Sequence, residues 1–157
     1  MNIAILQLGT FGDLILCTPV LPELKSRFPD SKVFFIVGRR NQQVLWNNPF
    51  VDKIIVWDKS IPRIFSTIYS LMESKFDFYV DPKDHFSRES LLIAKLVRAN
   101  TKIGFNGKFK TFDIEIPDYV SNKNLHFTQR IFQAFETLGI VTPDTENIPK
   151  PQLFPSK

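Results

Sequence analysis

The N-terminal stretch NIAILQLGTFGDLILCTP (Asn2 to Pro19) decides the fold, because an apolar run stops abruptly in a glycine-rich turn. The run over 2–8 predicts a buried parallel strand. Apolar residues at helical spacing predict a helix over 14–28. Pro19 lies inside this range, so it either begins a helix capped by Thr18 or kinks the helix. A buried strand followed by a tight turn and a helix is typical of an α/β domain.

The remaining sequence repeats this alternation of strand and helix patterns. Strands are predicted over 32–38, 53–58, 76–81 and 101–105, with an alternating edge strand over 111–116. Helices are predicted over 41–48, 61–74, 87–99 and 124–138. The pattern predicts an α/β fold with a Rossmann-like, doubly wound and mostly parallel sheet. We expect one domain over 1–141, and residues 142–157, with four prolines, to form a linker.

Composition narrows the class of protein. The chain has 157 residues, 43% of them hydrophobic, which fits one domain with a substantial core. No apolar run is long enough to span a bilayer, and a single cysteine favours a reducing compartment, so we expect a cytoplasmic protein. The net charge of +4 is compatible with an acidic ligand or an anionic membrane surface. The sequence lacks the dense basic or aromatic-basic motifs of nucleic-acid-binding proteins.

Four loops are expected to form the site. Ligands of doubly wound sheets bind beyond the carboxyl ends of the strands. The segments that follow predicted strands are 9–13, 38–41, 58–62 and 81–88. We therefore predict that these four segments meet at one edge of the sheet.

The first of these loops does not fit a phosphate-binding motif. It has the pattern G-x-x-G-D, which is neither the dinucleotide fingerprint nor a Walker A loop, and this argues against an NAD-type enzyme. The carboxylate of Asp13 would also repel a pyrophosphate. Two interpretations remain open for Asp13. It is either an N-terminal helix cap or a general base near a sugar hydroxyl, where the helix dipole favours its ionised form.

Five segments in order resemble glycosyltransferase family 9, the ADP-heptose:lipopolysaccharide heptosyltransferase family. They are LQLGTFGDLILCTPVLPELKSRFP (6–29), NPFVDKIIVWDK (48–59), FDFYVDPKDHFSRESLL (76–92), KIGF (102–105) and LHFTQRIFQAFETLGI (125–140). The sequence departs from the family at Asp81-Pro82-Lys83, where the family has D-L-Q. Because the glutamine is missing, the resemblance leaves the acceptor specificity open.

The resemblance implies a function as well as a fold. The family has the GT-B fold, and this chain matches only its N-terminal, acceptor-side half, followed by the linker towards an absent donor domain. The implied activity is inverting transfer of a heptose or related sugar from a nucleotide-sugar, ADP-linked, to a lipopolysaccharide core or similar glycan. No metal or other cofactor is implied. The expected location is the cytoplasmic face of the inner membrane, and the chain alone is expected to be inactive.

The resemblance also assigns roles to individual residues. Asp13 is the implied general base, and four neighbours in its loop would shape the acceptor pocket: Gly9, Thr10, Phe11 and Gly12. Four basic residues after the second and fourth strands are candidates for binding an acidic, Kdo-bearing acceptor: Arg39, Arg40, Lys83 and Arg88. Ordinary solvated charge is the alternative for these basic residues. The alternative for the whole chain is a non-catalytic Rossmann-like domain that binds a nucleotide or a protein partner.

Overall fold

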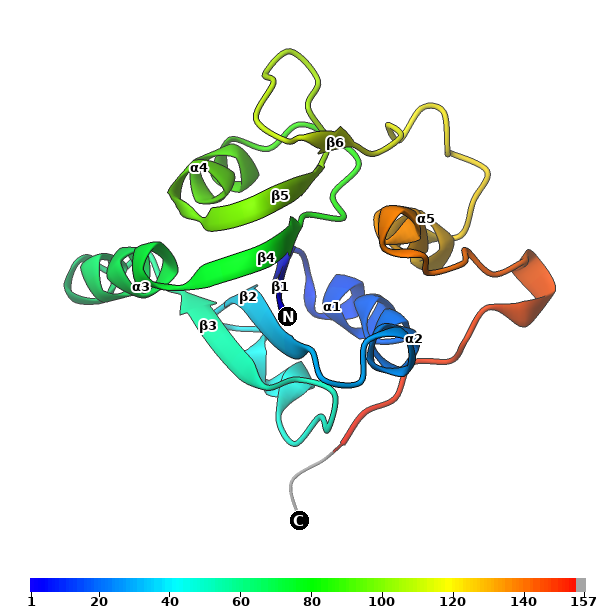
Figure 1. Cartoon of the computed structure of the whole chain (residues 1–157), viewed down its shortest axis with the longest axis horizontal. Coiled ribbons are helices and arrows are strands. Elements are labelled where there is room, and N and C mark those ends of the chain that lie inside the picture. Colours follow the sequence, from blue (N-terminus) through cyan, green and yellow to red (C-terminus); the bar gives the residue numbers. More distant parts are fainter. Residues whose placement is uncertain (155–157) are drawn as a thin grey trace.

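Six parallel strands form one sheet in the order β3-β2-β1-β4-β5-β6 (Figure 1). The computed structural model describes residues 1–154. The strands are β1 (Asn2–Gln7), β2 (Lys32–Gly38), β3 (Lys53–Trp57), β4 (Lys75–Val80), β5 (Arg98–Gly104) and β6 (Ile114–Glu115). The chain reverses its direction of travel across the sheet between β1 and β4, as in a Rossmann-like fold. The predicted α/β class and doubly wound sheet are confirmed, and every described strand pair is parallel.

Helices cover both faces of the sheet (Figure 1). The helices are α1 (Phe11–Cys17), α2 (Val20–Arg27), α3 (Ile61–Glu73), α4 (Arg88–Leu96) and α5 (Phe127–Gln133), and the short 3₁₀ turns are η1 (Gln42–Leu45), η2 (Glu136–Leu138) and η3 (Thr145–Asn147). One core packs α1, α2 and α5 against side chains such as Ile3 and Ile5, and the other packs α3 and α4 against Ala4 and Leu6. Alternate residues of β1 therefore belong to opposite cores, as its pleat requires.

The helix predicted over 14–28 is two helices that meet at Thr18 and Pro19. Thr18 ends α1, and its hydroxyl donates to the carbonyl of Ile15 at 2.8 Å. Pro19 takes the N-cap position of α2 in the right-handed helical conformation. Because proline lacks an N–H, it cannot continue the hydrogen-bond ladder of α1. The break, not a helix capped by Thr18, is the correct alternative.

Several further predicted bounds were wrong. The helix expected over 41–48 is only the 3₁₀ turn η1, and the edge strand expected over 111–116 is only the two-residue β6. The helix expected over 87–99 ends at Leu96, and Val97 is already extended. β5 then begins at Arg98, opposite Lys75, because it pairs with the full length of β4. The helix expected over 124–138 divides into α5 and the 3₁₀ turn η2. Gly139 follows η2, and its φ of 78° is the left-handed conformation that favours glycine.

The C-terminal tail lies against the domain over part of its length. The side chain of Gln129 donates to the carbonyl of Pro143 at 2.9 Å. The ring of Phe154 contacts that of Phe50 edge-on, with the centroids 6.3 Å apart. The last three residues, 155–157, lie outside the described part. The boundary between a domain over 1–141 and a linker over 142–157 remains a prediction. No helix within residues 1–154 combines the length and apolarity needed to cross a membrane.

Candidate functional site

The loops that follow β1 to β4 meet at one edge of the sheet and enclose two hollows. A cavity of about 180 Å³ lies between the β1 and β4 loops. A wider, open groove lies between the β1, β2 and β3 loops. Leu8, Gly9 and Asp13 line both, so the G-x-x-G-D turn forms the wall between them. The four predicted segments therefore do meet, in two neighbouring hollows.

Asp13 lies at the start of α1, where it forms a reciprocal cap with Thr10. The backbone N–H of Thr10 donates to Oδ2 of Asp13 at 2.6 Å, and the N–H of Asp13 donates to the Thr10 hydroxyl at 3.3 Å. This is a capping box in which Thr10, not Asp13, is the N-cap residue, and Asp13 takes part in the cap from the third position of the helix through Oδ2. Among the described residues, Oδ1 has no hydrogen-bond partner. One carboxylate oxygen thus fixes the side chain while the other is free to meet a ligand.

The turn before Asp13 is held in place from both sides. The N–H of Gly9 donates to the side chain of Gln7 at 3.0 Å. The carbonyl of Gly9 accepts a hydrogen bond from the side chain of Asn41, which comes from the β2 loop. A Cβ atom at position 9 would lie 2.4 Å from Oδ2 of Asp13. A side chain at position 9 would therefore displace the carboxylate of Asp13, which folds back against the backbone.

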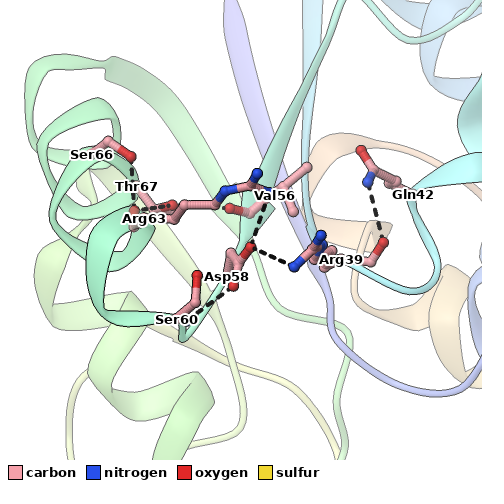
Figure 2. A network of polar contacts seen from close by, with 8 residues as sticks. All are labelled: Arg39, Gln42, Val56, Asp58, Ser60, Arg63, Ser66 and Thr67. Atoms are coloured by element: carbon pink, nitrogen blue, oxygen red, sulfur yellow. Dashed lines mark hydrogen bonds and ion pairs between the residues drawn. The ribbon is translucent and has the colours of Figure 1, made fainter.

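The groove is lined by a network of charges centred on Asp58 (Figure 2). Oδ2 of Asp58 lies 3.6 Å from the guanidinium of Arg39 and 3.5 Å from that of Arg63, and Figure 2 shows Asp58 between the two. The backbone N–H of Ser60 donates to Oδ1 at 3.0 Å. The hydrogen bonds from Ser60, followed by the charges of Arg39 and Arg63, hold the pKa of Asp58 below its ordinary value. Asp58 is thus an anion that orients Arg39 at the wall of the groove.

The predicted binding residues are distributed unequally over the two hollows. Those that line the groove are Gly9, Thr10, Phe11, Arg39 and Arg40, whereas Lys83 lines the cavity with Gly9. Gly12 and Arg88 belong to neither set of lining residues. Arg88 is the first residue of α4 and is exposed. The roles of all these residues remain predictions.

Sequence reasoning missed two buried acids in the cavity wall, Asp81 and Asp84. Asp81 is 3% exposed and accepts a hydrogen bond from the N–H of Lys83 at 3.1 Å. Burial raises its pKa to about 6. Asp81 follows directly after the buried strand β4, and an acid in that position is a sequence pattern that could have identified it.

Asp84 is neutralised by a residue distant in sequence. Its carboxylate pairs with the guanidinium of Arg130 on α5, and both side chains are largely buried. Arg130 in turn lies 4.9 Å from the ring centroid of Tyr119 and 5.2 Å from that of Phe127. The other oxygen of Asp84 lies 3.1 Å from Nδ1 of His85, which is exposed and lines the cavity. The ion pair thus attaches α5 to the β4 loop beside the site.

No group of His, Cys, Asp and Glu side chains within residues 1–154 is arranged to hold a metal ion. The described polar groups of the two hollows are carboxylates, guanidinium and ammonium groups, hydroxyls, the side-chain amides of Gln7 and Asn41, and the imidazole of His85. Such a set can bind hydroxyls and anionic groups, and it can accept a proton.

Comparison with known proteins gives one consistent result. No protein-family model matches the chain. The chain is similar to lipopolysaccharide heptosyltransferase 1 of Campylobacter coli, with 22% identity over 90% of this chain and 41% of that protein. It is also similar to lipopolysaccharide heptosyltransferase 3 of Escherichia coli, with 27% identity over 59% of this chain and 28% of that protein. The chain therefore spans less than half of the length of these relatives.

Solved structures share the fold. The E. coli heptosyltransferase WaaC with ADP superposes with a TM-score of 0.76 at 18% identity, over 92% of this chain and 50% of that one. The glycosyl transferase family 9 protein from Veillonella parvula superposes with a TM-score of 0.77 at 22% identity, over 99% of this chain and 46% of that one. The chain is thus similar in sequence to part of the lipopolysaccharide heptosyltransferases, and its fold matches the N-terminal, Rossmann-like half of the heptosyltransferase GT-B fold.

Proposed function

We propose that the chain is the acceptor-binding half of an inverting glycosyltransferase. The complete enzyme would transfer a heptose or a related sugar from an ADP-linked donor to a lipopolysaccharide core or similar lipid-linked glycan. The names of its relatives support this class of reaction, and two solved structures of the E. coli heptosyltransferase WaaC contain ADP or ADP-2-deoxy-2-fluoro heptose. The observation that carries the proposal is the position of Asp13, whose carboxylate stands at the junction of the cavity and the groove.

In the proposed reaction, Asp13 accepts a proton from the acceptor hydroxyl. The acceptor oxygen forms a bond to the anomeric carbon of the donor while the bond from that carbon to the diphosphate oxygen breaks. The bonding electrons leave with ADP, and attack from the opposite face inverts the anomeric centre. Because Thr10 already binds Oδ2, the proton goes to Oδ1, which faces no protein donor among the described residues. The cap and the base are then two functions of one carboxylate.

The basic residues would bind the acidic part of the acceptor. Arg39 and Arg40 line the groove on one side of Asp13, and Lys83 lines the cavity on the other. A carboxylated sugar held between them would place a neighbouring hydroxyl near Asp13. Binding of the nucleotide-sugar is assigned to groups outside this chain. A lipid-linked acceptor would place the protein at the cytoplasmic face of the inner membrane.

Equilibrium binding separates this proposal from the alternative of a nucleotide-binding module. The 157-residue chain is titrated by calorimetry with a short Kdo-containing acceptor mimic, and separately with ADP and with a neutral sugar of equal size. The proposal predicts saturable binding of the acidic acceptor, weakened by salt, and no saturable binding of ADP. Saturable ADP binding without acceptor binding would contradict it.

A further inference from the structure

Helix α3 has an apolar stripe that the protein leaves uncovered. Ile61 is 81% exposed, Phe65 71%, Tyr69 63% and Met72 49%. Their spacing of four, four and three residues places them along one side of the helix. The side chains of Thr67 and Leu71, on another side, are buried against the sheet. The apolar face of α3 is therefore wider than the part that the sheet covers.

The surroundings of this stripe are basic. Exposed basic residues flank or belong to α3 and its neighbour α4: Lys59, Arg63, Lys75, Arg88, Lys95 and Arg98. Two of these basic residues are paired with acids, Lys59 with Glu89 at 2.8 Å and Arg63 with Asp58 at 3.5 Å, and Glu73 is a further acid of α3. Leu92 of α4 is a further half-exposed apolar residue. The layer formed by α3 and α4 thus combines an apolar stripe with a positive fringe.

The stripe begins at the edge of the groove. Asp58, Lys59 and Ser60 line the groove, and Ile61 is the next residue in the chain. Whatever covers the stripe therefore lies directly beside the opening through which an acceptor would enter. Figure 1 shows α3 on the side of the sheet opposite to α5 and the C-terminal tail.

We propose that the α3 stripe contacts an anionic phospholipid bilayer. Phenylalanine and tyrosine are suited to the boundary between headgroups and acyl chains, and the basic fringe would attract anionic headgroups. In its link to the acceptor, this proposal rests on the proposed function, because a bilayer in this position would present a lipid-linked glycan at the groove. A second copy of the chain is less suited to cover the stripe than a bilayer is. The four side chains offer on the order of 500 Å², whereas a stable interface buries about 800 Å² per partner.

Vesicle co-sedimentation of the full chain tests the surface. We expect binding to vesicles of phosphatidylglycerol and phosphatidylcholine in equal parts, weakened by salt, and little binding to phosphatidylcholine alone. The double variant F65S/Y69S should lower the partition coefficient at least about ten-fold, because two interfacial aromatic rings are lost. Lys95→Glu, outside the stripe, should lower it by about five-fold or more. The matched control V120S/V141S replaces valines that are 72% and 82% exposed and should bind like the parent.

A second measurement needs no variant. Amide NMR of the parent chain with vesicles containing a paramagnetic headgroup lipid should broaden α3 residues before those of α5. The proposal is overturned if the chain does not bind anionic vesicles, if the α3 signals are not broadened, or if F65S/Y69S binds like the control. It is also overturned if the parent is a dimer that F65S/Y69S dissolves, since a second copy then covers the stripe. Titration with the soluble acceptor mimic needs no bilayer, so failure of the membrane contact and failure of the proposed function are distinguishable.

Discussion

A Cβ atom at Gly9 would lie 2.4 Å from Oδ2 of Asp13, so the two residues cannot both keep their places if position 9 carries a side chain. The same oxygen caps α1 through the N–H of Thr10. The turn thus determines the direction of the carboxylate that we assign as the general base.

Replacement of Gly9 by alanine should therefore displace Asp13. We expect Gly9→Ala to lose about 1 kcal/mol of unfolding free energy, the usual value of a helix cap, together with most of its affinity for the acceptor mimic. Gly12→Ala is the stability control, because its Cβ would lie 3.8 Å from the nearest atom, the Thr10 hydroxyl. Urea unfolding measures both variants. Equal stability of Gly9→Ala and the parent would refute the steric argument.

The buried carboxyl of Asp81 should make the folded state less stable as the pH rises. Its pKa is raised from 3.8 to about 6 in the folded chain, so between these values the folded state binds more protons than the unfolded state. The unfolding free energy contributed by this group therefore falls from pH 4 to pH 7, by an amount on the order of 2–3 kcal/mol. Asp81→Asn removes this loss and keeps an acceptor for the N–H of Lys83.

Urea unfolding of the parent and Asp81→Asn at pH 4, 5, 6 and 7 measures the difference between the two proteins. Asp52 and Asp58, whose pKa values are lowered, act in the opposite direction but are common to both. Asp81→Asn should gain stability relative to the parent as the pH rises. A constant difference across the series would show that the pKa of Asp81 is not raised in the folded chain.

The ion pair between Asp84 and Arg130 should be the most costly to break. Arg130→Met keeps the packing against Tyr119 and Phe127 but leaves Asp84 buried without its cation. The expected loss is about 3–5 kcal/mol. Lys59→Met, which breaks the exposed pair with Glu89, should cost no more than about 1 kcal/mol. Thermal or urea unfolding ranks the two, and similar losses would contradict the assignment of Arg130 as a buried structural partner.

Arg40 should contribute more than Arg39 to binding of an acidic acceptor. Arg39 is already partly neutralised by Asp58, whereas Arg40 has no ion-pair partner among residues 1–154. We expect Arg40→Gln to weaken binding of the acceptor mimic by about five- to ten-fold, as for loss of a charged hydrogen-bond donor. Arg39→Gln should have a smaller effect. Titrations at two salt concentrations test this order, and the reverse order would place the acidic group nearer Asp58.

The sequence predicts the elements of this fold better than their ends. Long apolar runs such as Lys32–Gly38 are unambiguous, and their regular alternation with helical patterns identifies the sheet. The end of α4 was missed because neither glycine nor proline marks it. Strand β5 starts at Arg98 only because β4 supplies a partner there, and such pairing is a tertiary effect.

The candidate site was predictable in its location and only partly in its members. The loops were identified because parallel strands end at a common edge. Arg130 was missed because its partner Asp84 is 46 residues away, and no local pattern links the two. The ion pair that engages Arg39 also depends on the tertiary structure, since Asp58 follows a different strand.

The most direct test of the central claim is an amide-NMR titration of the labelled chain, with one arm adding the Kdo-containing acceptor mimic and the other an ADP-sugar. We predict saturable shifts of the Gly9 to Asp13 amides with the acceptor alone, and their loss in Asp13→Ala. Saturable shifts of these amides with the ADP-sugar alone would contradict the account, because the turn would then bind a nucleotide and not a sugar hydroxyl.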